Sequence, residues 1–169
     1  NLLFLYKDPK SNIVSWCKRK FPKTSNDDTL LFSKTELEEG IKWWVEISTQ
    51  ILNWLNLQDR EISILSLEDF SQDPKAMTMS LCGWLGIEFD PTSINFWDRG
   101  LHYIGGNHSV KRLSPDRHFY RRIAIDERWK NHLSNSDANR IDEHVEIVSI
   151  LERISKIASR SQSSFFRLP

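Results

Sequence analysis

The chain begins Asn1-Leu-Leu-Phe-Leu-Tyr-Lys-Asp-Pro-Lys-Ser-Asn-Ile-Val-Ser-Trp16, an apolar run that leads into a proline turn and a helical pattern. Residues 2–6 are uninterrupted apolar residues of strand length, typical of a strand that is buried on both faces of a parallel sheet. Pro9 ends this run because it has no backbone N–H to donate to a sheet. A helix is expected from Asn12 onward. The segment therefore predicts a strand that passes directly into a helix.

The turn between these two elements has the features of an anion site. Lys7 stands at the predicted carboxyl end of the strand, and Ser15 follows eight residues later, one turn into the helix. The N–H groups and the dipole at a helix amino terminus favour negative charge. The alternative interpretation is a buried strand, a proline turn and a solvated basic helix end without a ligand.

The distribution of charge supports a small anionic ligand more than a polyanion. The 169 residues carry 23 Lys and Arg against 23 Asp and Glu, so a nucleic-acid partner is not indicated. Positive charge gathers in residues 7–23 and 111–122, and acidic residues gather in 59–73. Two basic segments that converge on one ligand would explain this pattern, and solvated surface faces are the alternative.

No metal site, disulfide scaffold or membrane segment is expected. Cys17 and Cys82 are the two cysteines, and neither they nor the five histidines show metal-ligand spacing. No run reaches transmembrane length and no leader is present, which indicates a cytoplasmic protein. The chain starts inside a predicted strand without a starting Met. We therefore expect it to be a fragment of a longer protein.

Further elements alternate between helix and strand. Residues 33–55 are predicted to form a long, mostly buried helix that Ser33 or Thr35 caps. Residues 61–66 are a second predicted strand, and a helix then runs from about Pro74 to a carboxyl-terminal cap at Gly86. This order predicts an α/β fold with right-handed crossovers.

The last predicted element is one amphipathic helix over residues 134–160. Ser134 and Asp137 resemble a capping box at its start. Its expected apolar stripe consists of Ile141, Val145, Val148, Leu151 and Ile154. Residues 161–169 are expected to be a polar tail.

The first of these segments resembles a motif of the sulfotransferases that use 3′-phosphoadenosine 5′-phosphosulfate (PAPS). Lys7-Asp-Pro-Lys-Ser-Asn-Ile-Val-Ser15 is similar to Arg-(Asn/Asp)-Pro-x-x-x-x-x-Ser, with Lys7 where the family has arginine. Ile64-Leu-Ser-Leu-Glu-Asp-Phe-Ser-Gln-Asp-Pro-Lys75 is similar to the family's Tyr-Glu-Asp-(Leu/Met)…Asp-Pro, with Leu67 in place of tyrosine. Lysine can neutralise a phosphate, although without the bidentate fork of arginine.

A third segment near the carboxyl end also resembles this family. Arg122-Ile-Ala-Ile-Asp-Glu-Arg-Trp-Lys-Asn-His-Leu133 is similar to Arg-Lys-Gly-x-x-Gly-(Asp/Glu)-Trp-Lys-Asn-x-(Phe/Leu). Here Ile and Ala replace Lys-Gly, so that part of the phosphate clamp is either missing or supplied by Arg121, Lys111 or Arg112. The alternative is that Arg121 and Arg122 are a surface pair near a helix end.

The resemblance implies a fold, a reaction and a binding site. The fold would be a P-loop-NTPase-like, three-layer parallel sheet flanked by helices, with residues 1–160 as a partial sulfotransferase-like domain and 161–169 as a tail. The reaction would move a sulfuryl group from PAPS to a hydroxyl or amine of a small-molecule or glycan acceptor, without a metal. The residues that would bind the 3′-phosphate of PAPS, or of its product PAP, are Lys7, Ser15, Arg121 and Arg122.

The resemblance also limits what can be assigned. The family's 5′-phosphosulfate loop and catalytic base precede the strand that starts here, so no catalytic residue is assigned. If Arg122 or Arg121 binds the 3′-phosphate, its guanidinium should lie close to Lys7 and Ser15. The alternatives are a sulfotransferase-like interaction domain that does not bind the donor and, less favoured, a relative of the P-loop kinases. The acceptor and the oligomeric state cannot be identified from the sequence.

Overall fold

The computed structural model describes residues 2–22, 31–95 and 125–160. These residues belong to two compact units. One unit combines the chain up to Glu68 with the chain from Asp126 onward, and the other lies between them in the sequence. None of the helices within the described ranges is long and apolar enough to cross a membrane.

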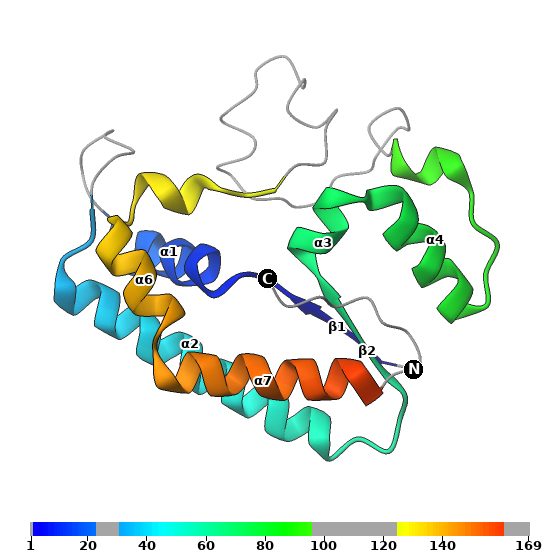
Figure 1. Ribbon diagram of the computed structural model, residues 1–169, viewed down its shortest axis with the longest axis horizontal. Helices are drawn as coiled ribbons and strands as arrows, with labels where there is room; N and C mark the ends of the chain where they lie inside the picture. Colours follow the sequence, from blue (N-terminus) through cyan, green and yellow to red (C-terminus); the bar gives the residue numbers. More distant parts are fainter. Residues whose placement is uncertain (1, 23–30, 96–124, 161–169) are drawn as a thin grey trace. The chain divides into compact units, whose positions relative to one another are not determined.

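The first unit contains a two-stranded parallel sheet (Figure 1). Strand β1 (Leu2–Tyr6) pairs with β2 (Ile62–Ser66), with Leu2 opposite Ile62 and Tyr6 opposite Ser66. The predicted parallel pair is thus confirmed, with β2 beginning one residue later than expected. The prediction that β1 is buried on both faces is wrong, because Leu3 and Leu5 on one face are 39% and 63% exposed. Because the strands are parallel, their last residues, Tyr6 and Ser66, lie at the same edge of the sheet. The sheet and its flanking helices make the chain an α/β protein.

Helix α1 (Pro9–Lys20) follows β1 and begins three residues earlier than the sequence pattern predicts. Asp8 is its amino-terminal cap, because its Oδ1 accepts a hydrogen bond from the backbone N–H of Ser11 at 3.2 Å. Pro9 then occupies the first helical position, where its missing N–H costs nothing. The turn after β1 is therefore very short.

Helix α2 (Lys34–Asn56) packs against α1 and starts with a capping box. Ser33 is the cap, because its hydroxyl accepts from the N–H of Glu36 at 3.3 Å and the carboxylate of Glu36 accepts from the N–H of Ser33 at 2.7 Å. The prediction of a mostly buried helix is wrong. Near the carboxyl-terminal end of α2, the side chain of Trp54 is 52% exposed. Helix α2 is therefore amphipathic, with one side facing solvent.

The two helices approach each other most closely at Gly40. A Cβ atom placed on Gly40 would lie 2.6 Å from Cys17 Sγ and 2.9 Å from Ile13 Cγ2. The indole rings of Trp16 and Trp43 stack nearby, with centroids 5.4 Å apart. Glycine at this position therefore allows α1 and α2 to pack at short distance.

The prediction of a single helix over residues 134–160 is wrong, because the chain forms two helices there. Helix α6 (Asn135–Asp142) ends before His144, and α7 (Val145–Arg160) lies along α2 and β2 (Figure 1). The predicted cap is confirmed, since Ser134 Oγ accepts from the N–H of Asp137 at 3.1 Å. The break changes which side chains are buried in α7: Ile147 is fully buried, whereas Val145 is 81% exposed.

The second unit contains most of the short helix α3 (Leu67–Gln72), all of α4 (Pro74–Leu85) and a 3₁₀ helix, η1 (Pro91–Ile94). Asp73 caps α4 through its Oδ1, which accepts from the N–H of Ala76 at 3.0 Å. Gly86 ends α4 with a φ angle of 69°, a left-handed conformation that glycine adopts without strain. Both predicted boundaries of this helix are confirmed.

Burial makes Cys17 unreactive, and this can be tested. Its thiol is fully buried and donates to the carbonyl of Glu36, and burial followed by the charge of Glu36 raises the pKa of Cys17 to about 12. Because the thiolate is the reactive form, iodoacetamide at pH 8 should leave Cys17 unmodified in the folded protein and modify the half-buried Cys82. Mass spectrometry over time would show this, and guanidinium should make both thiols reactive. Rapid labelling of Cys17 in a folded Cys82→Ser variant would contradict it.

Candidate anion site at the end of β1

Lys7 follows the last residue of β1, at the sheet edge where open α/β folds place their ligands. Its side chain is 23% exposed, and its Nζ lies 3.1 Å from Oδ2 of Asp126. The side-chain amide of Asn12 donates to the backbone carbonyl of Lys7 at 3.5 Å. The turn and α1 thus hold Lys7 in place while its ammonium group reaches a segment more than a hundred residues away.

Asp126 lies between two cations. Its Oδ1 accepts from Arg128 Nε at 2.7 Å, and its Oδ2 accepts from Arg128 Nη2 at 2.8 Å as well as from Lys7. The hydrogen bonds from Arg128 first, and those from Lys7 next, hold the pKa of Asp126 well below its usual range, although partial burial opposes this shift. Asp126 is therefore ionised at neutral pH, and the three side chains together carry one net positive charge.

The amino terminus of α1 contributes less to an anion site than its sequence predicts. Pro9 has no N–H, and the N–H of Ser11 already donates to Asp8. The hydroxyl of Ser11 donates to the backbone carbonyl of Asp126 at 3.1 Å. The carboxylate of Asp8 thus occupies the amino-terminal end of α1. The binding of an anion there would depend mainly on cationic side chains.

Ser15 lies on α1 and is exposed rather than turned into the apolar core. It follows Ser11 by four residues and precedes Lys18 by three, a spacing that places all three on one side of the helix. Ser11 contacts Asp126, and Lys18 Nζ lies 3.1 Å from Nε2 of His132. The side of α1 that carries Ser15 therefore faces the segment of residues 126–132.

The sheet edge also carries negative charge. Burial, followed by the carboxylates of Asp8, Glu68 and Asp142, raises the pKa of Tyr6 far above its usual value. Tyr6 therefore stays a neutral phenol and does not offset the positive charge of Lys7. Among the described residues, the ammonium group of Lys7 is directed to Asp126 at this edge.

The Trp-Lys-Asn part of the third motif anchors its segment to α1. Residues Arg128–Asn131 form a 3₁₀ helix, η4, that packs against α1. The Nζ of Lys10 lies 5.1 Å from the ring centroid of Trp129 and 2.5 Å from Oδ1 of Asp142. Trp129 thus fixes η4 against the helix that carries Ser15.

The structure brings together some residues that the sequence did not connect. Arg121 and Arg122 lie outside the described residues, so their predicted convergence on Lys7 and Ser15 stays a prediction. Ser11, Asp126 and Arg128 were not predicted as neighbours of Lys7. Asp126 and Arg128, three residues and one residue before Trp129, were the available signal, but only the tertiary contact shows that they meet Lys7.

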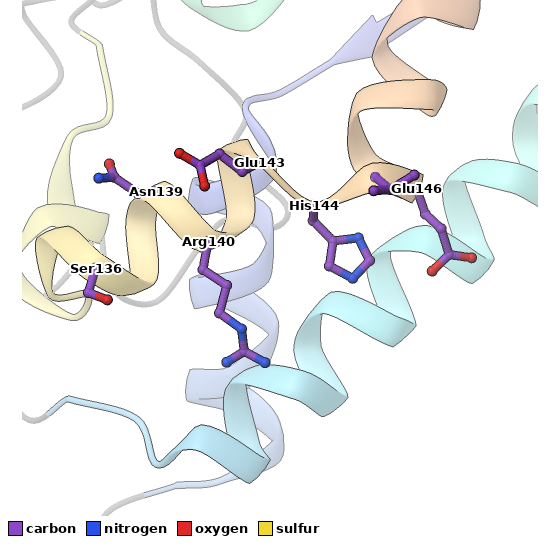
Figure 2. Close-up of a pocket in the computed structure, with 7 residues that line it drawn as sticks. Ser136, Asn139, Arg140, Glu143, His144 and Glu146 are labelled. Atoms are coloured by element: carbon purple, nitrogen blue, oxygen red, sulfur yellow. The ribbon is translucent and has the colours of Figure 1, made fainter.

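A separate cavity of about 870 Å³ lies at the break between α6 and α7. Arg140 and His144 extend to one side in Figure 2 and Glu143 to the other, and Arg140 is ion-paired with Glu38 of α2. Nδ1 of His144 is buried without a hydrogen-bond partner among the described residues. The cavity contains none of the predicted site residues, and its mixed charge favours no one class of ligand. Within residues 2–22, 31–95 and 125–160, no group of three or more His, Cys, Asp or Glu could hold a metal ion.

Comparison with known proteins identifies the family. The sulfotransferase domain family matches residues 1–158. Among solved structures, the chain is similar to a sulfotransferase domain from the curacin biosynthetic pathway, with 18% identity and a TM-score of 0.52. That alignment covers 99% of this chain and 54% of the solved one, so the chain spans about half the length of that domain. At this identity the similarity concerns the fold alone.

No curated protein matches the sequence. The family match nevertheless extends from β1 almost to the end of α7, through all three motif segments. On that basis, the chain belongs to the sulfotransferase family.

Proposed function

We propose that this chain supplies the 3′-phosphate site of an enzyme that moves a sulfuryl group from PAPS to a hydroxyl or amine of a small-molecule or glycan acceptor. Membership of the family supports sulfuryl transfer. The observation that carries the donor site is the position of Lys7 at the carboxyl end of β1, facing residues 126–132.

The proposed reaction is an in-line displacement at sulfur. The acceptor oxygen or nitrogen forms a bond to sulfur while the bond from sulfur to the bridging phosphate oxygen breaks, and PAP leaves with that electron pair. The acceptor's proton passes to a base. Such a reaction depends mainly on positioning and on stabilising negative charge. In this proposal the 3′-phosphate anchors the donor, and no residue of this chain is assigned to catalysis.

Chain geometry supports the participation of the two arginines. Arg122 and Arg121 precede Asp126 by four and five residues, and an extended chain spans at most about 3.5 Å per residue. In this proposal, the contact of Asp126 with Lys7 brings the segment that follows these arginines to the site, and the arginines complete the binding of a phosphate held by Lys7 and Ser15. An arginine would add the bidentate contact that a lysine lacks.

The wider organisation follows from the same proposal. We place β1 and β2 in a larger P-loop-like, three-layer sheet, with residues 1–160 as one sulfotransferase-like domain and 161–169 as a tail. PAPS is the co-substrate and no metal is required. A cytoplasmic location stays a prediction.

Calorimetry with two nucleotides tests the site. The protein should bind PAP more tightly than 5′-AMP, which lacks the 3′-phosphate. The variants Lys7→Ala, Ser15→Ala and Arg122→Ala should each weaken PAP binding by about ten- to a hundredfold, the equivalent of roughly 1.5–3 kcal/mol per charge-assisted contact. Binding of 5′-AMP should change little. Lys20→Ala, at the exposed carboxyl end of α1, is the matched control and should leave PAP binding unchanged.

The alternative function is an interaction domain that does not bind the donor. The ion pair of Lys7 with Asp126 favours it, because the ammonium group already has a carboxylate partner. Equal binding of PAP and 5′-AMP by the wild-type protein would reject the donor site and support this alternative.

A further inference from the structure

We propose that Lys10 is a positioning residue of the 3′-phosphate site, because its ammonium group holds the two segments that flank Lys7. This inference rests on the proposed function and adds a residue that does not itself touch the donor. Nζ of Lys10 lies 2.5 Å from Oδ1 of Asp142 and 3.7 Å from Oδ2 of Asp8. The same ammonium group lies 5.1 Å from the ring centroid of Trp129. One cation on α1 thus contacts three separate segments of the chain.

Lys10 differs from the cations at the other end of α1 because it is nearly buried. Its side chain is 12% exposed, whereas Lys18, Arg19 and Lys20 in the last turn of α1 are exposed. Removal of a charge from water is unfavourable unless partners compensate for it, and here two carboxylates and an aromatic ring do so. These partners fix the ammonium group of Lys10, which suits it to hold protein segments together rather than to bind a ligand.

The first segment that Lys10 holds is the turn that carries Lys7. Asp8 directly follows Lys7, and its Oδ1 caps α1 by accepting from the N–H of Ser11 at 3.2 Å. The other carboxylate oxygen of Asp8 is the one that faces Lys10. Each oxygen of Asp8 therefore has its own partner, and together they restrict the turn at the end of β1.

The second segment is the one that contacts the ammonium group of Lys7. Trp129 belongs to η4 and follows Asp126 by three residues, and Oδ2 of Asp126 lies 3.1 Å from Lys7 Nζ. Asp142, the last residue of α6, binds Lys10 while Lys10 faces the indole ring. Without Lys10, η4 would lose one of the interactions that keep Asp126 beside Lys7.

A phosphate site depends on where its cations are held before the ligand binds. Ordering of a long side chain during binding costs free energy, and a side chain that is already held avoids part of that cost. Lys10 should therefore change the affinity for the donor without contacting it. Its replacement leaves no fully buried charge, since Asp142 is 52% and Asp8 27% exposed, so we expect its variants to fold.

Hydrogen exchange of the full chain tests the positioning in the absence of nucleotide. Three N–H groups of residues 130–133 donate to the carbonyls of Glu127 and Trp129. In Lys10→Met, which has a side chain of similar length without the charge, these amides should exchange roughly three- to tenfold faster. Lys10→Arg keeps the cation and should exchange close to the wild-type rate. Lys20→Met, the matched control on the exposed end of α1, should change nothing.

Calorimetry with PAP and 5′-AMP connects this positioning with the site. Lys10→Met should weaken PAP binding by about three- to tenfold, less than Lys7→Ala, and leave 5′-AMP binding unchanged. Lys10→Arg should restore most of the affinity. Trp129→Phe weakens the same cation–π contact, so its effect should be non-additive with that of Lys10→Met. Ile147→Ala controls for stability, because Ile147 is buried in α7 away from these contacts, and the folded variant should bind PAP normally.

The outcomes separate this inference from the proposed function. Unchanged hydrogen exchange or unchanged PAP affinity in folded Lys10→Met would overturn the role of Lys10, and so would strict additivity with Trp129→Phe. An equal loss of affinity in Ile147→Ala would also overturn it, since stability would then be the cause. In each case the proposed function stands if Lys7→Ala weakens PAP binding.

Circular dichroism melting shows whether each variant is folded. If Lys10→Met does not fold, Trp129→Phe carries both measurements, with smaller changes expected in the same direction. If the wild-type protein shows no preference for PAP over 5′-AMP, the proposed function fails and the inference about Lys10 fails with it.

Discussion

Replacing Ile147 with alanine should lower the free energy of unfolding by about 3 kcal/mol. Ile147 is fully buried in the first turn of α7, which packs against α2 and β2. Truncation would remove buried methyl groups and leave a cavity that the surrounding helices and sheet fill only partly. Urea denaturation followed by circular dichroism would measure the loss.

Val148→Ala is the matched comparison for this prediction. Val148 is the next residue, also β-branched and in the same helix, but its side chain is 38% exposed. We expect it to cost less than about 1 kcal/mol, because little apolar area is uncovered. A larger loss at Val148 than at Ile147 would mean that α7 presents the face that the sequence periodicity predicted.

Replacing Gly40 with alanine should destabilise the protein by about 2 kcal/mol. The new Cβ would meet Cys17 Sγ at 2.6 Å and Ile13 Cγ2 at 2.9 Å, so α1 and α2 would have to separate. Overpacking of this kind costs up to about 3 kcal/mol or more, and the better helix propensity of alanine returns about 1 kcal/mol. Chemical denaturation and thermal melting would both report the difference.

Gly83→Ala in α4 controls for helix propensity. A Cβ on Gly83 has no neighbour within 4 Å, so alanine should stabilise by about 0.5–1 kcal/mol. In a Cys17→Ala background the penalty of Gly40→Ala should shrink, because the sulfur atom is gone. An undiminished penalty there would contradict the close approach of the two helices at Cys17.

Local signals predicted much of the secondary structure. An apolar run and a proline predicted β1 and its end, and the caps at Ser33, Ser134 and Gly86 lie where their residue types placed them. These signals involve residues within one helical turn of each other. A cap satisfies backbone groups three residues away whatever the rest of the chain does.

The carboxyl-terminal helices show where periodicity alone was insufficient. The apolar stripe through Val145 and Val148 was predicted for one continuous helix. Because the chain breaks after α6, the buried face of α7 contains Ile147 and Ile150 instead. Several nearby residues are apolar, so more than one stripe satisfies the helical period. Packing of α7 against α2 and β2 selects the one that buries more area.

By itself, the sequence determined the two strands, the position of Lys7 at the end of β1 and the place of Ser15 on α1, because strand length, proline and helical spacing act between near neighbours. Only the tertiary structure decided that Lys7 meets Asp126 and, through it, Arg128. Those residues are separated from Lys7 by more than a hundred positions, and no local pattern specifies a partner at that distance. Their contact exists because Trp129 and Ser11 hold η4 and its preceding turn against α1, and that packing is a property of the whole core.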